Sequence, residues 1–150
     1  MQKEPGNCMS PEEFINTAER LLKGAGPESD KRSAISRSYY GAFHECKGNL
    51  PSRHAPSASQ YRSEESHKAV IDALAQWGKS LDPGRTDAQQ AGRKLMRLKL
   101  ARRNADYEIE TPVIDADVTS CVVKAKEIVV HVKRARTLFD AGQEPREATN

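Results

Sequence analysis

The sequence predicts an all-α protein, an antiparallel bundle of four to five helices, on three observations. First, apolar residues recur three and four positions apart along most of the chain, which is the period of an amphipathic helix. Second, the segments with this period are bounded by Pro, Gly, Ser and Asp residues of the kind that begin and end helices. Third, no segment shows a convincing strand pattern, because the valine and isoleucine pairs at residues 113–114 and 129–130 are too short or lie inside helical periods.

The chain of 150 residues suits one domain. We expect the helical bundle over residues 10–141, between a flexible N-terminus at residues 1–9 and a flexible tail at residues 142–150. Apolar residues make up 37% of the chain and aromatic residues 5%, which is lean for a globular core. The net charge of +3 does not by itself indicate a nucleic-acid binder, so only the distribution of the charges can.

The first helix should begin at Ser10 and Pro11, which suit the N-cap and the first helical position. It should end near Lys23, where glycines follow. Asp30 is expected to cap the second helix, which ends near Gly48. The apolar stripes expected to face the core are Phe14, Ala18, Leu21 and Leu22 in the first helix and Ile35, Tyr39, Ala42, Phe43 and Cys46 in the second.

A long loop and a third helix are predicted next. Residues 49–62 are rich in Pro and Ser, as in loops that are functional or mobile. The third helix should open at Ser63 and end before the turn at residues 81–84. Its apolar spine is Val70, Leu74 and Trp77.

The fourth helix is predicted from Thr86 or Asp87 to about Tyr107, and the fifth, after a short connector, from Asp115 to about Ala141. The fifth helix carries a regular seam of Val118, Cys121, Ala125, Ile128, Val132, Ala135 and Phe139. This heptad-like spacing suits packing along a bundle or across a dimer axis.

The second helix also carries a polar face. Arg37, Tyr40 and His44 lie at positions i, i+3 and i+7, so a cation, a phenol and an imidazole share one stripe. Such a stripe suits contacts with RNA or with a phosphate. The plainer interpretation is a solvated helix face with Tyr40 half-buried.

Charge is segregated around the end of the fourth helix. From Arg93 to Arg103 there are six basic residues and no acid, and from Asp106 to Asp117 there are five acids and no base. Acids at a helix C-terminus oppose the macrodipole, so their presence there suggests specific pairing.

One apolar row of the fourth helix ends in a charge. The row Ala91, Leu95 and Leu98 continues to Arg102, and a neighbouring row runs through Met96, Leu100, Arg103 and Tyr107. A charge on a core stripe needs a partner or solvent, and Asp106 is four residues from Arg102. The plain structural interpretation is a salt bridge between Arg102 and Asp106, with Tyr107 as a lid on the bundle.

Two segments together resemble the HEPN superfamily, small helical domains of prokaryotic defence and toxin–antitoxin loci. They are RSAISRSYYGAFHE at residues 32–45 and RRNADYEI at residues 102–109. The resemblance covers roughly residues 10–140 and implies an antiparallel bundle of four or five helices. It also implies a dimer in which the Arg-Asn helix ends of two subunits meet in a cleft.

Ribonucleases of this superfamily carry an Arg-x4-6-His motif with a polar residue, often Asn, directly after the Arg. Arg103 and Asn104 match its first part, but no His follows at that spacing, so the chain is an "ADY" variant. The resemblance implies catalytic roles for Arg103, Asn104, Asp106 and Tyr107. The candidate RNA-binding residues are Arg102, Arg97, Lys99, Arg37, Tyr40 and His44.

Two hypotheses about function remain open. In the first, the chain is an RNA- or phosphate-binding HEPN-like domain of a toxin–antitoxin or defence-type system, with a degenerate or weak metal-independent endoribonuclease site. In the second, it is a non-catalytic module that dimerises or docks on a partner, for example a nucleotidyltransferase from the same locus. A weaker third hypothesis is a small-molecule or nucleotide binder.

The remaining expectations concern cofactors, partners and location. No cofactor and no metal are expected, because the histidines show no ligand spacing with Cys or acids. A homodimer is expected, with RNA and a protein of the same locus as partners, and no membrane contact because no apolar run is long enough. The start of the chain lacks an apolar signal core, and its three cysteines suggest free thiols, so a cytoplasmic location is expected.

Overall fold

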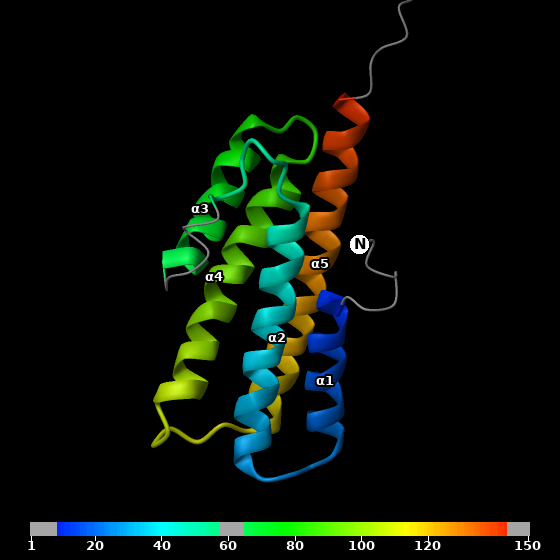
Figure 1. Ribbon diagram of the computed structural model, residues 1–150. Coiled ribbons are helices and arrows are strands. Elements are labelled where there is room, and N and C mark those ends of the chain that lie inside the picture. Colours follow the sequence, from blue (N-terminus) through cyan, green and yellow to red (C-terminus); the bar gives the residue numbers. More distant parts are fainter. Residues whose placement is uncertain (1–8, 58–64, 144–150) are drawn as a thin grey trace, which may run out of the picture.

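The computed structural model describes residues 9–57 and 65–143, and this part of the chain forms five α-helices and no strand (Figure 1). The predicted all-α helical bundle is therefore confirmed. Ser63, the predicted start of the third helix, lies outside the described residues, as does most of each predicted flexible end. The helices are α1 (Pro11–Lys23), α2 (Glu28–Asn49), α3 (Glu65–Ser80), α4 (Arg85–Tyr107) and α5 (Asp115–Gln143).

Helix α2 lies at the centre of the bundle and packs against α1, α4 and α5. Figure 1 shows α1 beside its lower half and α5 behind it. Helices joined by short connections run antiparallel, namely α1 with α2, α3 with α4 and α4 with α5. Helix α3 packs chiefly on α4 and lies beside only the upper part of it, so the lower part of α4 has no helix on that side.

Helices α2 and α4 begin slightly before their predicted starts. Helix α2 begins at Glu28 because Pro27 takes the N-cap position in an extended conformation, and the amide of Asp30 donates to the Pro27 carbonyl 2.9 Å away. Asp30 therefore lies in the first turn and is not the cap. Helix α4 begins at Arg85, after Gly84 with a φ of 109°, a left-handed conformation that glycine adopts without steric cost.

Helix α5 continues through Gln143, so Gly142 and Gln143 belong to the helix and not to the predicted tail. In α1, Ile15 and Ala18 are buried, whereas Phe14 and the two leucines of the predicted stripe are only partly buried. None of the described helices combines the length and the hydrophobicity of a membrane-spanning segment.

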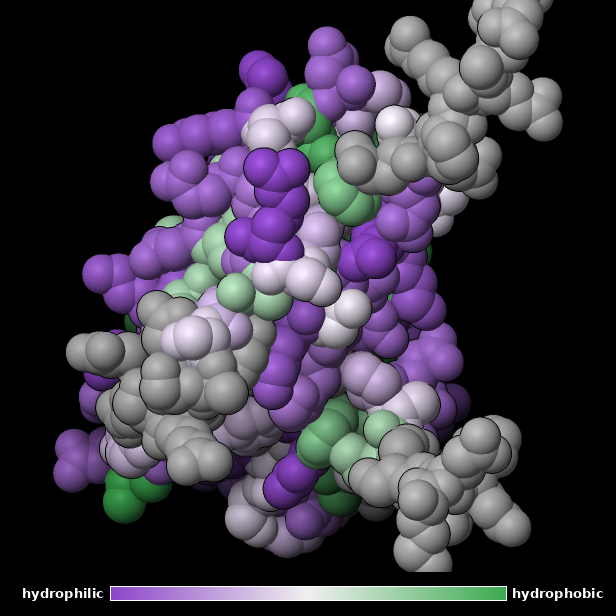
Figure 2. All heavy atoms as spheres, turned by 45° about the horizontal axis from the view of Figure 1, so that its top comes forward, coloured by the Kyte–Doolittle hydropathy of each residue, from purple (hydrophilic) through white to green (hydrophobic). Residues whose placement is uncertain are grey.

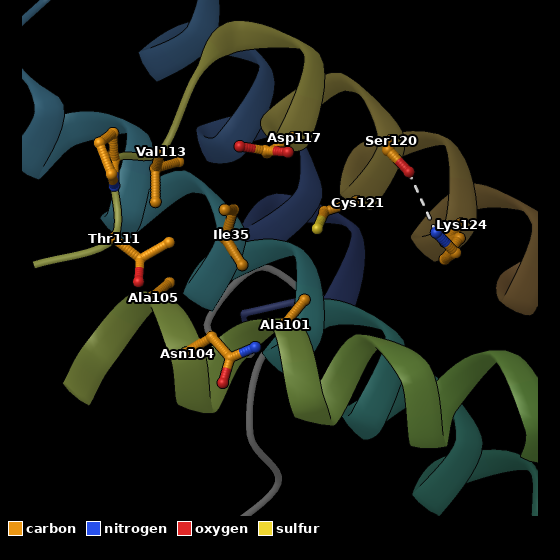
Figure 3. Close-up of a pocket in the computed structure, with 11 residues that line it drawn as sticks. Ile35, Ala101, Asn104, Ala105, Thr111, Val113, Asp117, Ser120, Cys121 and Lys124 are labelled. Carbon is orange, nitrogen blue, oxygen red and sulfur yellow. Dashed lines mark hydrogen bonds between the residues drawn. The ribbon is translucent and has the colours of Figure 1, made fainter. Parts of the chain in front are cut away.

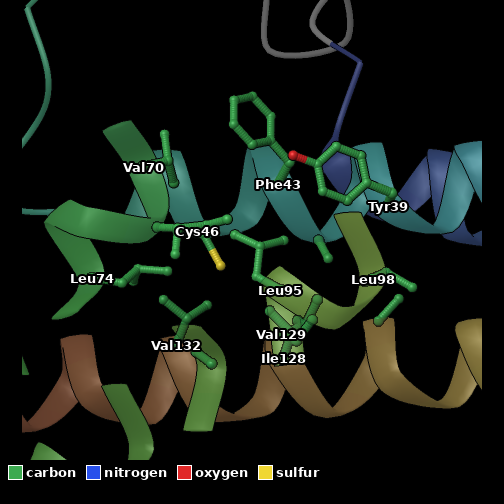
Figure 4. Packing of buried hydrophobic residues seen from close by; sticks show 14 of the residues in the cluster. Tyr39, Phe43, Cys46, Val70, Leu74, Leu95, Leu98, Ile128, Val129 and Val132 are labelled. Carbon is green, nitrogen blue, oxygen red and sulfur yellow. The ribbon is translucent and has the colours of Figure 1, made fainter. Parts of the chain in front are cut away.

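Buried apolar side chains from all five helices form one hydrophobic core. Figure 4 shows the part of it where α2, α3, α4 and α5 meet. The predicted core stripe of α2 and the seam of α5 both lie in it, with only Phe139 partly exposed. On the face shown in Figure 2, hydrophobic side chains form only small, separate patches among hydrophilic ones. Because the α5 seam packs within its own chain, it no longer argues for a dimer, and the homodimer stays a prediction.

The contact between α1 and α2 depends on Gly41. A Cβ atom at this position would lie 2.6 Å from Cγ1 of Ile15 and 3.0 Å from the carbonyl oxygen of Pro11. Real Cβ atoms do not approach their neighbours so closely, so any larger residue would push α1 away from α2. The glycine in the YYGAFH segment therefore lets the two helices pack closely.

Candidate functional site at the end of α4

Arg102 is turned into the bundle, where it continues the buried row of α4. Its side chain is only 12% exposed, and Nη1 lies 3.4 Å from Oδ2 of Asp106. The guanidinium carbon lies 5.5 Å from the ring centre of Tyr39 and 6.0 Å from that of Tyr40, within the range of cation–π attraction. The predicted pairing of Arg102 with Asp106 is thus present, and two tyrosines of α2 complete the surroundings of the cation.

His67 of α3 lies on the other side of Tyr39. The Tyr39 hydroxyl and Nδ1 of His67 are 2.6 Å apart. Burial raises the pKa of Tyr39, and the nearby charge of Arg102 offsets only part of this effect. The phenol therefore stays protonated and shares a hydrogen bond with Nδ1 of His67. Tyr39 thus contacts both His67 and Arg102, and the spacing of residues in the sequence does not predict that His67 takes part in this cluster.

The predicted polar face of α2 is formed, and it gathers around Phe14 of α1. The ring centre of Phe14 lies 5.7 Å from the guanidinium of Arg37, 6.4 Å from the ring of Tyr40 and 5.6 Å from the stacked ring of His44. Burial, and to a lesser degree the charge of Lys47, lowers the pKa of His44. This face thus contributes to the packing of α1 on α2, and of its residues only Tyr40 reaches Arg102.

The four candidate catalytic residues do not form one cluster. Successive residues of a helix point about 100° apart, so Arg102, Arg103 and Asn104 face three directions. Asp106 pairs with Arg102, Asn104 lies in a groove beside α5, and Arg103 is exposed. Tyr107 is 67% exposed and does not cover the bundle, so its expected role as a lid is wrong. Tyr107 is the last residue of α4 and lies on its exposed side, where it has too few apolar neighbours to be buried.

The candidate RNA-binding residues of α4 are also spread around the helix. Arg97 and Arg103 are exposed, and Lys99 is partly exposed. Two of the six basic residues are already neutralised, because Lys94 pairs with Glu127 of α5 and Arg102 pairs with Asp106.

The groove beside Asn104 is a cavity of about 290 Å³ between the end of α4 and the start of α5 (Figure 3). Asn104 lies across it from Ser120 and Lys124, whose Nζ donates to the Ser120 hydroxyl over 3.0 Å. Ile35 of α2 forms part of its floor. Cys121, also in the wall, is a free thiol whose pKa burial raises to about 11, so it is not a nucleophile near neutral pH.

Arg32 of α2 holds the end of α4 and the connector to α5. Its guanidinium donates to the carbonyls of Ala105 at 2.8 Å and Thr111 at 2.6 Å, and also to those of Glu108 and Ile109 at 3.2 Å. The Ala105 carbonyl belongs to the last turn of α4, which has no basic residue of its own, and the other three carbonyls follow the helix. Arg32 therefore acts as a remote C-cap, a role that the sequence analysis did not foresee.

The four histidines of the chain lie elsewhere than beside Arg103 and Asn104. His131 lies 2.8 Å from a carboxylate oxygen of Asp87 near the start of α4, and His54 lies in the loop after α2. His44 stacks on α1, and His67 bonds to Tyr39. Among the described residues, no group of His, Cys, Asp or Glu is arranged to hold a metal ion.

No family model matches this chain, and no curated protein is detectably similar to it in sequence. The resemblance to the HEPN superfamily therefore rests on the two quoted segments.

Proposed function

We propose that the protein is a HEPN-like module that acts in a prokaryotic toxin–antitoxin or defence-type system by binding a partner rather than by cleaving RNA. The observation that carries this proposal is the environment of Arg102. The cation that should hold a phosphate is instead largely buried against the rings of two tyrosines and paired with Asp106.

The chemistry of RNA cleavage supports the same proposal. Metal-independent cleavage needs a base for the 2′-hydroxyl and a cation for the phosphate within reach of one substrate. Asp106 is already paired with Arg102, and no imidazole lies beside Arg103 or Asn104. Histidine is the most common general base in enzymes, whereas Tyr107 offers only a phenol. These residues therefore suit a structural role better than a catalytic one.

RNA binding without cleavage is the second candidate function. Arg93, Arg97 and Arg103 are exposed on α4, and the exposed ring of Tyr107 lies beyond them. Exposed cations contact phosphates, and an exposed aromatic ring can stack on a base. In this case affinity should fall steeply with salt, because phosphate contacts release counterions.

The test is to incubate the protein with a generic single-stranded RNA in the presence of a chelator. We expect no cleavage above that of a blank. Rapid cleavage that is lost in the Arg103→Ala and Asn104→Ala variants would overturn the proposal, and because both positions are exposed, the loss could not be attributed to unfolding. Binding without cleavage, weakened by salt and by Arg102→Ala with Arg103→Ala, would establish the second candidate instead.

A further inference from the structure

Three large apolar side chains of α4 are exposed in one row. Met96 is 57% exposed, Leu100 is 59% exposed and Tyr107 is 67% exposed. Together with Arg103 they are spaced four, three and four residues apart, so they follow one line along the helix. The row from Met96 to Tyr107 spans about 16 Å, which is three helical turns. Isolated exposed apolar residues are ordinary, but apolar residues aligned at this spacing, here interrupted once by Arg103, are typical of a helix-packing surface.

The row is exposed because α3 does not extend along it. Helix α3 packs on the first half of α4, where Gly78 lies next to Ala88 and Gly92 lies next to Leu74. A hollow of about 240 Å³ lies between the two helices and has Ile71 and Met96 in its wall. Below this hollow the same side of α4 carries Leu100, Arg103 and Tyr107, on which no described helix packs. A helix laid below α3 would continue the packing that α3 begins.

From Met96 to Arg103 the charges that flank the row are all positive, and acids begin only at its end, with Asp106 and Glu108 next to Tyr107. No acidic residue occurs between Ala88 and Ala105. Arg93 and Arg97 lie along one side of the row and Lys99 lies along the other, while Arg103 is within it. The two basic residues of this stretch that have ion pairs, Lys94 and Arg102, point toward other helices. The row is therefore an apolar seam bordered by cations.

We propose that this seam, formed by Met96, Leu100, Arg103 and Tyr107 with Arg93, Arg97 and Lys99 at its borders, docks an acidic amphipathic helix of a partner protein. The proposal rests on the proposed function and names the chemistry of the partner. The apolar stripe of such a helix covers Met96 and Leu100 and fills the hollow beside Ile71. Its flanking carboxylates pair with the bordering cations, as in the e and g positions of a coiled coil.

Two other occupants fit the seam less well. A second copy of this chain laid parallel on the seam would bring two sets of cations together, and like charges across an interface are unfavourable. An RNA strand would satisfy the cations and could stack on Tyr107, but it would leave Met96 and Leu100 against a polar backbone. An acidic helix satisfies both the apolar side chains and the charges.

The experiment uses three fluorescent peptides and the full chain. The first peptide is a 16-residue helix with Leu at the a and d positions and Glu at the flanks. The second has Lys in place of each Glu, and the third has the composition of the first in a scrambled order. We expect the wild type to bind only the Glu peptide, with an affinity that falls as salt is added.

Two variants and a matched control locate the site. Leu100→Ser should weaken binding by about tenfold, because it removes an apolar side chain from the centre of the contact. Val123→Ser, at a 48% exposed valine on α5, should leave binding unchanged. The double variant Arg97→Glu with Arg103→Glu should bind the Lys peptide more tightly than the Glu peptide. All these positions are exposed, so circular dichroism should show an intact fold for each variant.

Several results would overturn the inference. They are equal binding of the Glu and Lys peptides, no binding at low salt, or the same loss in Val123→Ser as in Leu100→Ser. A dimer that Leu100→Ser converts to a monomer would assign the seam to a second copy, and RNA binding lost in Leu100→Ser would assign it to nucleic acid. If the chain neither cleaves RNA nor binds the peptide, the docking of an acidic helix on the seam is refuted but the proposed function is not. Cleavage of RNA refutes the proposed function.

Discussion

Removing the carboxylate of Asp106 should destabilise the protein measurably. The Asp106→Ala variant leaves the guanidinium of Arg102 in place, with a side chain only 12% exposed and no acid beside it. An unpaired buried charge is costly, because water can no longer compensate it fully. The thermal midpoint of the variant therefore tests whether the pair holds the end of α4 in the bundle.

The expected loss can be bounded from the geometry. A hydrogen bond to a charged group contributes about 1.5–3 kcal/mol to stability, and an exposed ion pair contributes about 0–1 kcal/mol. The Arg102–Asp106 contact lies between these cases, because its N–O distance is 3.4 Å and Asp106 is 33% exposed. The rings of Tyr39 and Tyr40 also continue to stabilise the cation. We expect a loss of about 1–2 kcal/mol, which lowers the midpoint of a domain this size by roughly 2–8 °C.

The chain offers a matched control in α5. Arg136 and Asp140 have the same residue types at the same spacing near a helix end, but Asp140 is 57% exposed. Asp140→Ala should cost less than about 0.5 kcal/mol, as for other exposed pairs. Both variants remove an acid from a helix C-terminus, so their dipole effects cancel in the comparison. Equal midpoints for Asp106→Ala and the wild type, or equal losses in the two variants, would refute a structural role for the partly buried pair.

Four further outcomes are expected. Gly41→Ala should destabilise by about 1–3 kcal/mol because its Cβ overlaps Ile15, whereas Gly48→Ala, with open space at its Cβ, should stabilise by about 0.5–1 kcal/mol; chemical denaturation distinguishes the two signs. Arg32→Met should cost about 1–2 kcal/mol and speed hydrogen exchange at residues 105–113, since it removes four carbonyl contacts. Because the pKa of His44 is lowered in the folded state, the unfolded chain binds a proton at His44 more readily than the folded chain does, and the free energy of unfolding should fall as the pH drops below 6.5. His44→Gln should reduce this pH dependence of the thermal midpoint. Sedimentation at tens of micromolar tests the predicted homodimer, which requires twice the chain mass of 16.6 kDa.

The helical fold could be predicted because periodicity is a local property of the chain. The stripe from Ile35 to Cys46 is buried as its spacing indicates. The ends of helices were less predictable, because several residues compete for the cap. Asp30 has the better capping side chain, but Pro27 already sets the extended geometry and α2 begins next to it.

The candidate site could be predicted only where its contacts lie within one helix. The pair of Arg102 and Asp106 follows from their spacing, and the structure confirms it. The contacts of Arg32 with the end of α4 and of His67 with Tyr39 join residues far apart in the chain. The periodicity of the sequence does not predict such contacts, because they depend on how the helices pack against one another.

The glycine between α1 and α2 also determines how far along α2 the first helix can lie. One turn away from Gly41 in either direction, α2 carries Ser38 and Glu45, which have side chains. The backbone of α1 now lies against Gly41, which has no Cβ atom. If α1 were shifted by one turn along α2, its backbone would lie against the Cβ atom of Ser38 or Glu45. Only one register of the two helices therefore allows the close contact. The position of Phe14 along the polar face of α2 therefore depends on the absence of a Cβ atom at Gly41.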